Sequence, residues 1–199
     1  MERQDRVQGA LRHMGTAAAA VCVVAVVAFA AALDGYSHLG RPVGLLGAHG
    51  MPGATAFNAI AFVLPGVVAA VVGVRLRGRI PQTAGMLAGM GCWMLAVSGV
   101  AFAAQGLLPL DVNSLDGPIS QRHAAAWLLW WVAFIPGAAA LAAGLGRQQG
   151  WHRFALAQAV LAGVVLVMVV VPVPWWPAPV SQRIALCAWL LAVVLSGRR

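Results

Sequence analysis

The sequence predicts an all-α, polytopic membrane protein with a bundle of six transmembrane helices. Apolar residues make up 61% of the 199-residue chain, charged residues make up only 9%, and the mean hydropathy is +0.85. A water-exposed surface needs roughly a quarter charged residues, so this composition excludes a soluble fold. Because each spanning helix takes ~20 residues, the chain has room for a single membrane domain over residues 1-199.

The first apolar run covers residues 15-33 and follows three arginines, Arg3, Arg6 and Arg12. A secretory signal has the same layout, and Ala28-Phe29-Ala30 resembles a cleavage site. The run is nevertheless longer than the ~7 to 15 residues of a usual signal-peptide core. We therefore expect an uncleaved first helix.

Five further apolar runs have spanning length, at about residues 54-74, 83-104, 123-145, 154-171 and 184-196. Within the third helix, Gly85 and Gly89 are small residues four apart, which predicts close packing of helix backbones. Trp151 and the pair Trp175-Trp176 lie at run ends, where interfacial aromatic anchors are expected.

The three cysteines each lie in an apolar run without metal-ligand spacing, which predicts buried, unpaired thiols: Cys22, Cys92 and Cys187.

The arginines predict the orientation of the bundle. With the N-terminus inside, ten arginines fall on the inner side: Arg3, Arg6, Arg12, Arg75, Arg77, Arg79, Arg147, Arg153, Arg198 and Arg199. Only Arg41, Arg122 and Arg183 fall outside. This positive-inside bias predicts that both termini are cytoplasmic. The arginine-only, alanine-rich composition suggests a bacterial source, so we expect a multi-pass protein of a bacterial inner (plasma) membrane. The basic charge is explained by topology, so we expect no nucleic-acid partner.

The polar residues gather on the predicted outer side, and the loop at residues 34-53 holds a large share of them. Four residues form a candidate pocket. Asn58 lies about one turn inside a helix, where an unpaired amide would be costly, so it should face the bundle. His123 and Arg183 lie at the outer starts of two helices, and Asp111 lies on a proline-stiffened segment. We therefore predict that these four side chains converge on one pocket.

These polar residues also have simpler interpretations than a shared pocket. Arg183 or Arg122 can pair with Asp111 or Asp116, and the two loop histidines, His38 and His49, can be solvated. Asp34, His38, His49, Asp111 and His123 are residue types that bind zinc, but they lack an ordered spacing, so we assign no metal site. The sequence identifies no cofactor.

The order of several short motifs resembles a known family. The motifs are Tyr36-Ser37, Gly44-Leu45-Leu46-Gly47, Pro52, Phe57-Asn58, Gly66, Ser98-Gly99, Pro109-x-Asp111, His123 and Gln182-Arg183. Together they resemble the prokaryotic six-helix membrane family labelled domain of unknown function 998. Its layout is similar to the FRAG/DRAM group of eukaryotic six-helix proteins, some of which are linked to lipid remodelling or distribution.

The resemblance implies that Ser37, Asn58, Asp111, His123, Gln182 and Arg183 are recurrent positions. The family more often has Ile-Ser-Glu-Leu-Gly where this chain has residues 43-47, so this chain lacks that serine and glutamate.

Three functional hypotheses follow. The leading one is an outer-facing pocket that binds a lipid or lipid-linked headgroup. Arg183, with Arg122 nearby, would hold a phosphate or carboxylate, because a guanidinium donates two parallel hydrogen bonds to such groups. Asn58 and His123 would orient the headgroup, and Asp111 would fix His123 or Arg183. Ser37 and Gln182 are further candidate ligand-binding residues.

The second hypothesis is a membrane-embedded hydrolase or transferase, in which His123 acts as a general base or metal ligand and Asp111 orients it. In the third hypothesis the bundle is a non-catalytic subunit, associated with a partner subunit or with copies of itself. The sequence leaves open whether the protein is an enzyme.

Overall fold

The computed structural model describes residues 2–171 and 177–199. Its helices are α1 (Glu2–Ala32), α2 (Ala54–Phe57), α3 (Leu64–Arg77), α4 (Gly85–Leu107), α5 (Pro118–Leu145), α6 (His152–Val170) and α7 (Ala178–Gly197). A π-helical segment, η2 (Asn58–Val63), joins α2 to α3 in one continuous helix, and η1 (Val43–Gly47) and η3 (Gln82–Ala84) are short 3-10 turns. Six segments of the described chain are long and apolar enough to cross a membrane, which confirms the predicted fold class.

Two helices begin earlier than the hydropathy indicated. α5 starts at Pro118 rather than near residue 123, and α7 starts at Ala178 rather than near residue 184. Each has a proline in its first turn, where the fixed φ angle and the missing N–H suit a helix start. The polar residues expected at the starts of these helices are therefore held on helical backbone.

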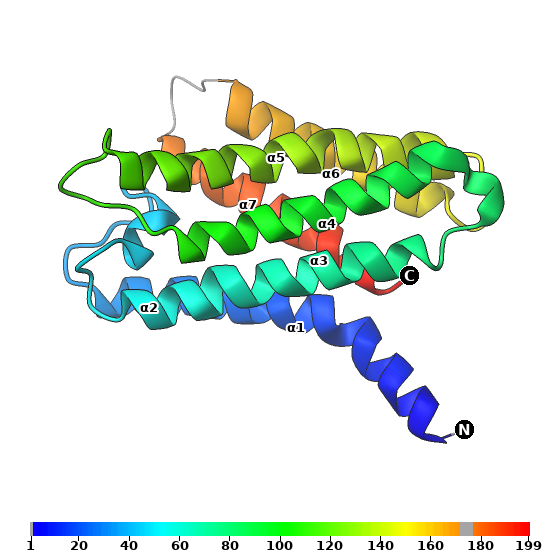
Figure 1. The fold of residues 1–199 in the computed structure, drawn as a ribbon, viewed down its shortest axis with the longest axis horizontal. Helices are drawn as coiled ribbons and strands as arrows, with labels where there is room; N and C mark the ends of the chain where they lie inside the picture. Colours follow the sequence, from blue (N-terminus) through cyan, green and yellow to red (C-terminus); the bar gives the residue numbers. More distant parts are fainter. Residues whose placement is uncertain (1, 172–176) are drawn as a thin grey trace.

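The six spans form a ring. Each packs against its neighbours along the chain, and α1 closes the ring by contacting both α3 and α7. Figure 1 shows the two termini at one end of the bundle, with the turns at 78–84 and 146–151. We call this the terminal end. The opposite end, which we call the loop end, carries residues 33–53 and 108–117. That the terminal end faces the cytoplasm stays a prediction from the arginine count.

Aromatic side chains fill the centre of the ring. The rings of Phe102 and Trp189 have centroids 4.4 Å apart, and Trp130 lies 5.8 Å from Trp189. The Trp189 indole N–H donates to the Ser98 hydroxyl at 3.0 Å, so this buried polar pair is satisfied inside the membrane region. The bundle centre is packed rather than open.

Helices α3 and α4 approach through glycine. A Cβ atom added to Gly99 would lie 2.7 Å from the Gly66 carbonyl oxygen, so only glycine allows this spacing. The predicted packing role of Gly85 is wrong: it opens α4 with a φ of +74°, and a Cβ there would meet nothing within 4 Å. Gly89 faces the Arg77 side chain instead of a helix backbone.

A buried thiol contacts the π-helical part of the second span. The Cys22 Sγ lies 3.2 Å from the Ala61 carbonyl oxygen and donates to it. Cys22 and Cys92 are buried as expected, whereas Cys187 is exposed on the outside of the ring, which corrects the prediction for that residue.

Trp151 packs its ring against Phe154 at the terminal end, at a centroid distance of 5.7 Å. Trp175 and Trp176, also expected as anchors, lie outside the described residues.

Candidate functional site

The long loop at residues 34–53 is tied to α7 through Arg183. The Arg183 Nη2 group donates to the Tyr36 hydroxyl at 2.8 Å and to the Arg41 carbonyl at 3.0 Å. The Tyr36 hydroxyl in turn donates to the Pro42 carbonyl at 3.1 Å. Burial raises the pKa of the Tyr36 hydroxyl, while the nearby positive charge of Arg183 acts in the opposite direction. Arg183 therefore acts first as a tether for the loop.

Two more predicted residues hold the same loop. The Gln182 Oε1 accepts a hydrogen bond from the Val43 N–H at 3.1 Å, and the Asn58 Nδ2 donates to the Gly47 carbonyl at 2.8 Å. We call the contacts of Asn58, Gln182 and Arg183 with residues 36–47 the loop latch. The latch fixes η1 (Val43–Gly47) as a buried turn over the bundle.

His123 is buried on the inner side of this turn, and its ring is held by two backbone oxygens. Its Nδ1 lies 2.9 Å from the Leu108 carbonyl and 3.1 Å from the Gln105 carbonyl. Carbonyl oxygens only accept, so Nδ1 carries the proton and Nε2 is left as an acceptor in the neutral ring. A Cβ added to Gly44 would lie 3.1 Å from Nε2, so η1 covers this atom.

A small cavity of about 20 Å³ lies beside His123, large enough for about one water molecule. Gln105, Trp127 and Trp130 line it, and their side-chain N–H groups have no hydrogen-bond partner in the part of the chain that the structure describes. Gln105 was not among the predicted site residues. The helix predicted from the sequence ends at residue 104, whereas α4 continues to Leu107, so Gln105 lies in the last turn of a helix.

Asp111 does not orient His123. Its Oδ1 accepts a hydrogen bond from the Asn113 N–H at 2.9 Å, and its backbone N–H and carbonyl each lie 3.1 Å from the Ser120 hydroxyl. The carboxylate therefore stabilises its own turn. The Asp111 and His123 pair on which the enzyme hypothesis depended is replaced by carbonyl contacts to His123.

The remaining predicted residues lie apart from the latch. Ser37 is exposed, and its Oγ accepts from the Gly40 N–H at 3.3 Å, which closes a local turn. Arg122 is exposed on the first turns of α5. Among the described residues, no three histidine, cysteine, aspartate or glutamate side chains lie close enough together to hold a metal ion.

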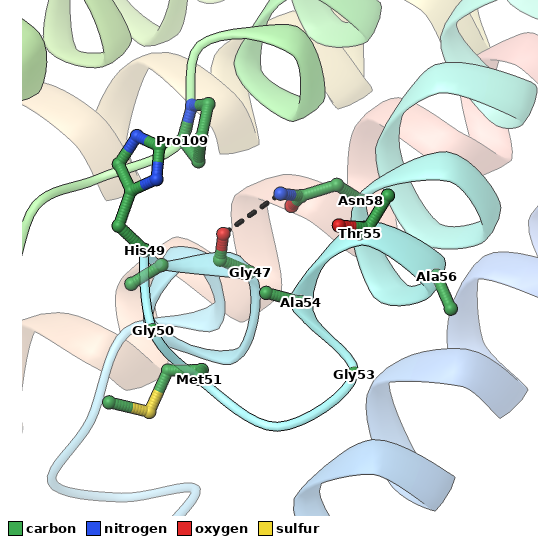
Figure 2. A pocket seen from close by; sticks show the side chains of 11 residues that line it. Gly47, His49, Gly50, Met51, Gly53, Ala54, Thr55, Ala56, Asn58 and Pro109 are labelled. Carbon is green, nitrogen blue, oxygen red and sulfur yellow. Dashed lines mark hydrogen bonds between the residues drawn. The ribbon is translucent and has the colours of Figure 1, made fainter.

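A larger pocket opens at the loop end, beside the last residue of η1 and the chain that follows it. It has a volume of about 480 Å³ and is lined by residues 47–51, 53–56, Asn58 and Pro109. Figure 2 shows Asn58 and Thr55 together on one wall, with His49 and Pro109 on another. The dashed line in the figure is the bond from Asn58 to Gly47, so a latch residue also forms part of this pocket.

A groove of about 360 Å³ runs along the outside of the ring between α6 and α7. Among the described residues it is lined by Val164, Ile184, Cys187, Ala188 and Leu191, together with the charged side chain of Arg183. In a membrane this surface faces hydrocarbon, since α6 and α7 are both spanning segments. The groove was not predicted, because its apolar lining has the same composition as any lipid-facing helix.

The fold and these sites define a class: a multi-pass helical membrane protein whose polar side chains gather at one end. The chain belongs to the family described as protein of unknown function (DUF998), whose model matches residues 16–199. This confirms the resemblance seen in the sequence. No curated protein and no solved structure matches the chain significantly.

Proposed function

We propose that this protein binds an anionic membrane lipid, with its headgroup at Arg183 and an acyl chain in the groove between α6 and α7. The observation that carries the proposal is the charge of Arg183. Among the described residues, the groups that accept its hydrogen bonds are the hydroxyl of Tyr36 and the carbonyls of Arg41 and Pro179, and all three are neutral. A half-buried guanidinium with neutral partners favours an anion.

The surroundings of Arg183 indicate which class of anion would bind. The groove below it is apolar along its length, and a lipid is an anion that carries its own hydrocarbon chain. The volume of about 360 Å³ lies within the usual range of ligand sites. The lipid would enter sideways from the bilayer, so no opening to water is required.

The position of Arg183 on α7 also fits headgroup depth. It lies near the start of the span Ala178–Gly197, where long basic side chains reach the polar region of a bilayer. Arg122, which was predicted to assist it, is exposed at the start of α5 and is not part of the groove. It serves as the matched control.

Mass spectrometry of lipids that co-purify with the protein tests the proposal. Arg183→Gln is expected to lower bound anionic phospholipid several-fold, because it removes the charge and keeps a polar side chain. Cys187→Phe should also lower it by filling the groove without touching the latch. Arg122→Gln should change nothing.

Arg183 also belongs to the latch, so a second control is needed. Gln182→Leu removes the contact to Val43 and keeps the guanidinium, and bound lipid should persist in this variant. Equal lipid content and composition in the wild type, Arg183→Gln and Cys187→Phe would contradict the proposal.

A further inference from the structure

The pocket of Figure 2 is separate from the groove at Arg183, and its lining has a different chemistry. The polar side chains among its lining residues are those of His49, Thr55 and Asn58, and none of them is an acid, a lysine or an arginine. This favours a neutral polar ligand over an anion or a metal cation, each of which is normally matched by opposite charge.

Asn58 gives the pocket an acceptor of fixed orientation. The residue is only 7% exposed. The Gly47 carbonyl can only accept, so the amide nitrogen must face it, and the bond of 2.8 Å fixes the orientation of the amide. Oδ1 packs beside the Gly47 Cα, where an added Cβ would overlap it. It is the acceptor that Asn58 can offer to a hydroxyl group in the pocket.

The other polar groups can both donate and accept. The Thr55 hydroxyl lies beside Asn58 on the same wall, and the exposed His49 ring lies opposite (Figure 2). A hydroxyl group on a ligand can donate to Asn58 and accept from Thr55 or His49 at once. Pro109 and Met51 supply apolar surface against which C–H groups can pack.

We infer that this pocket binds a neutral polyhydroxylated group, such as a sugar or a glycerol moiety. Its volume of about 480 Å³ exceeds what a single ion needs and lies within the range of small-ligand sites. The group can come from a free sugar in the outer compartment or from the headgroup of a glycolipid, because both present the same hydroxyl chemistry.

Saturable binding of methyl glucoside to the purified full-length protein, followed by ligand-observed NMR, tests the inference for a free sugar. The same protein in nanodiscs with and without a glucosyl diacylglycerol lipid tests the lipid source. Binding of either probe supports the site, and the arm that responds identifies the source. Binding of inorganic phosphate but neither glycoside would overturn it.

Three variants locate the site. Thr55→Val keeps the shape of an exposed residue and should weaken glycoside binding about five- to tenfold, the effect of one lost hydrogen bond. Ala54→Leu should abolish binding by filling the pocket. Ser37→Ala changes an exposed hydroxyl outside the pocket and should have no effect. Unchanged binding in both Thr55→Val and Ala54→Leu would overturn the inference.

Arg183→Gln distinguishes this site from the proposed lipid groove. It should lower bound anionic phospholipid and leave glycoside binding unchanged, since Arg183 does not line the pocket. The phospholipid result and the glycoside result can therefore fail independently of each other.

Discussion

The loops at the two ends of the bundle are held by different kinds of contact. At the loop end, Asn58 and Gln182 bond to backbone groups of a buried turn. At the terminal end, an exposed pair joins two turns: Thr83 Oγ1 lies 2.9 Å from Gln148 Oε1, and Gln148 Nε2 lies 3.0 Å from the Thr83 carbonyl. Buried polar contacts are costly to break, whereas water replaces exposed ones.

This difference explains why the polar residues of the loop end resemble a catalytic site in the sequence. A loop that lies over a membrane bundle needs partners for its backbone groups, and helix side chains provide them. Asn58, Gln182 and Arg183 are used in this way. The loop end is therefore an ordered surface that carries both proposed ligand sites, whereas the terminal end consists of short turns.

The largest expected effect comes from Gly47→Ala. A Cβ there would overlap the Asn58 side chain and break its bond to the Gly47 carbonyl, leaving two buried polar groups unpaired. We expect a loss of about 2 to 3 kcal/mol in the free energy of unfolding, measured by thermal or denaturant unfolding in detergent. Gly40→Ala is the control, because the nearest atom to its Cβ would be 3.8 Å away.

The same change in an Asn58→Ala background should cost much less, because the overlapping side chain is gone. If the two changes were simply additive, the contact between Gly47 and Asn58 would not be the cause.

Gln182→Leu should have an intermediate effect. It leaves the N–H of the buried residue Val43 without its acceptor, at an expected cost of about 1 to 2 kcal/mol. Limited proteolysis of residues 36–42 should also become faster, because the latch is weakened. If the variant were as stable and as protease-resistant as the wild type, Gln182 would not be holding the loop in place.

Tyr36 gives a pH-dependent effect of smaller size. Its pKa is raised by burial in the folded protein, so its contribution to stability is complete at pH values below the unfolded pKa of about 10 and is lost as pH rises through the folded pKa. Tyr36 is the one tyrosine of the chain, so tyrosinate absorbance reports it directly. Its titration midpoint should lie above that of free tyrosine, and the alkaline loss of stability should be smaller in Tyr36→Phe. A midpoint at or below the free value would contradict this.

The smallest expected effect is at the terminal end. Thr83→Val removes an exposed hydroxyl contact to Gln148 and should change stability by no more than about 0.5 kcal/mol. A loss as large as that of Gly47→Ala would show that the two ends do not differ as described.

The sequence predicted the six spans and the end at which polar residues gather, because hydropathy and arginine counts report those features directly. It also selected Asn58, Gln182 and Arg183 as candidate ligand-binding residues, a role that stays a prediction. It did not predict that they bond to the loop rather than to one another, since that depends on how η1 folds back between them. Asp111 illustrates the limit: its carboxylate bonds to Asn113 two residues away, a local contact that a search for distant partners overlooks.

A structure determined in nanodiscs that contain an anionic phospholipid tests the central claim most directly. The account predicts density for an acyl chain between α6 and α7, with the phosphate within hydrogen-bonding distance of the Arg183 guanidinium. A map that resolves annular lipids elsewhere on the bundle and leaves this groove without one would contradict it.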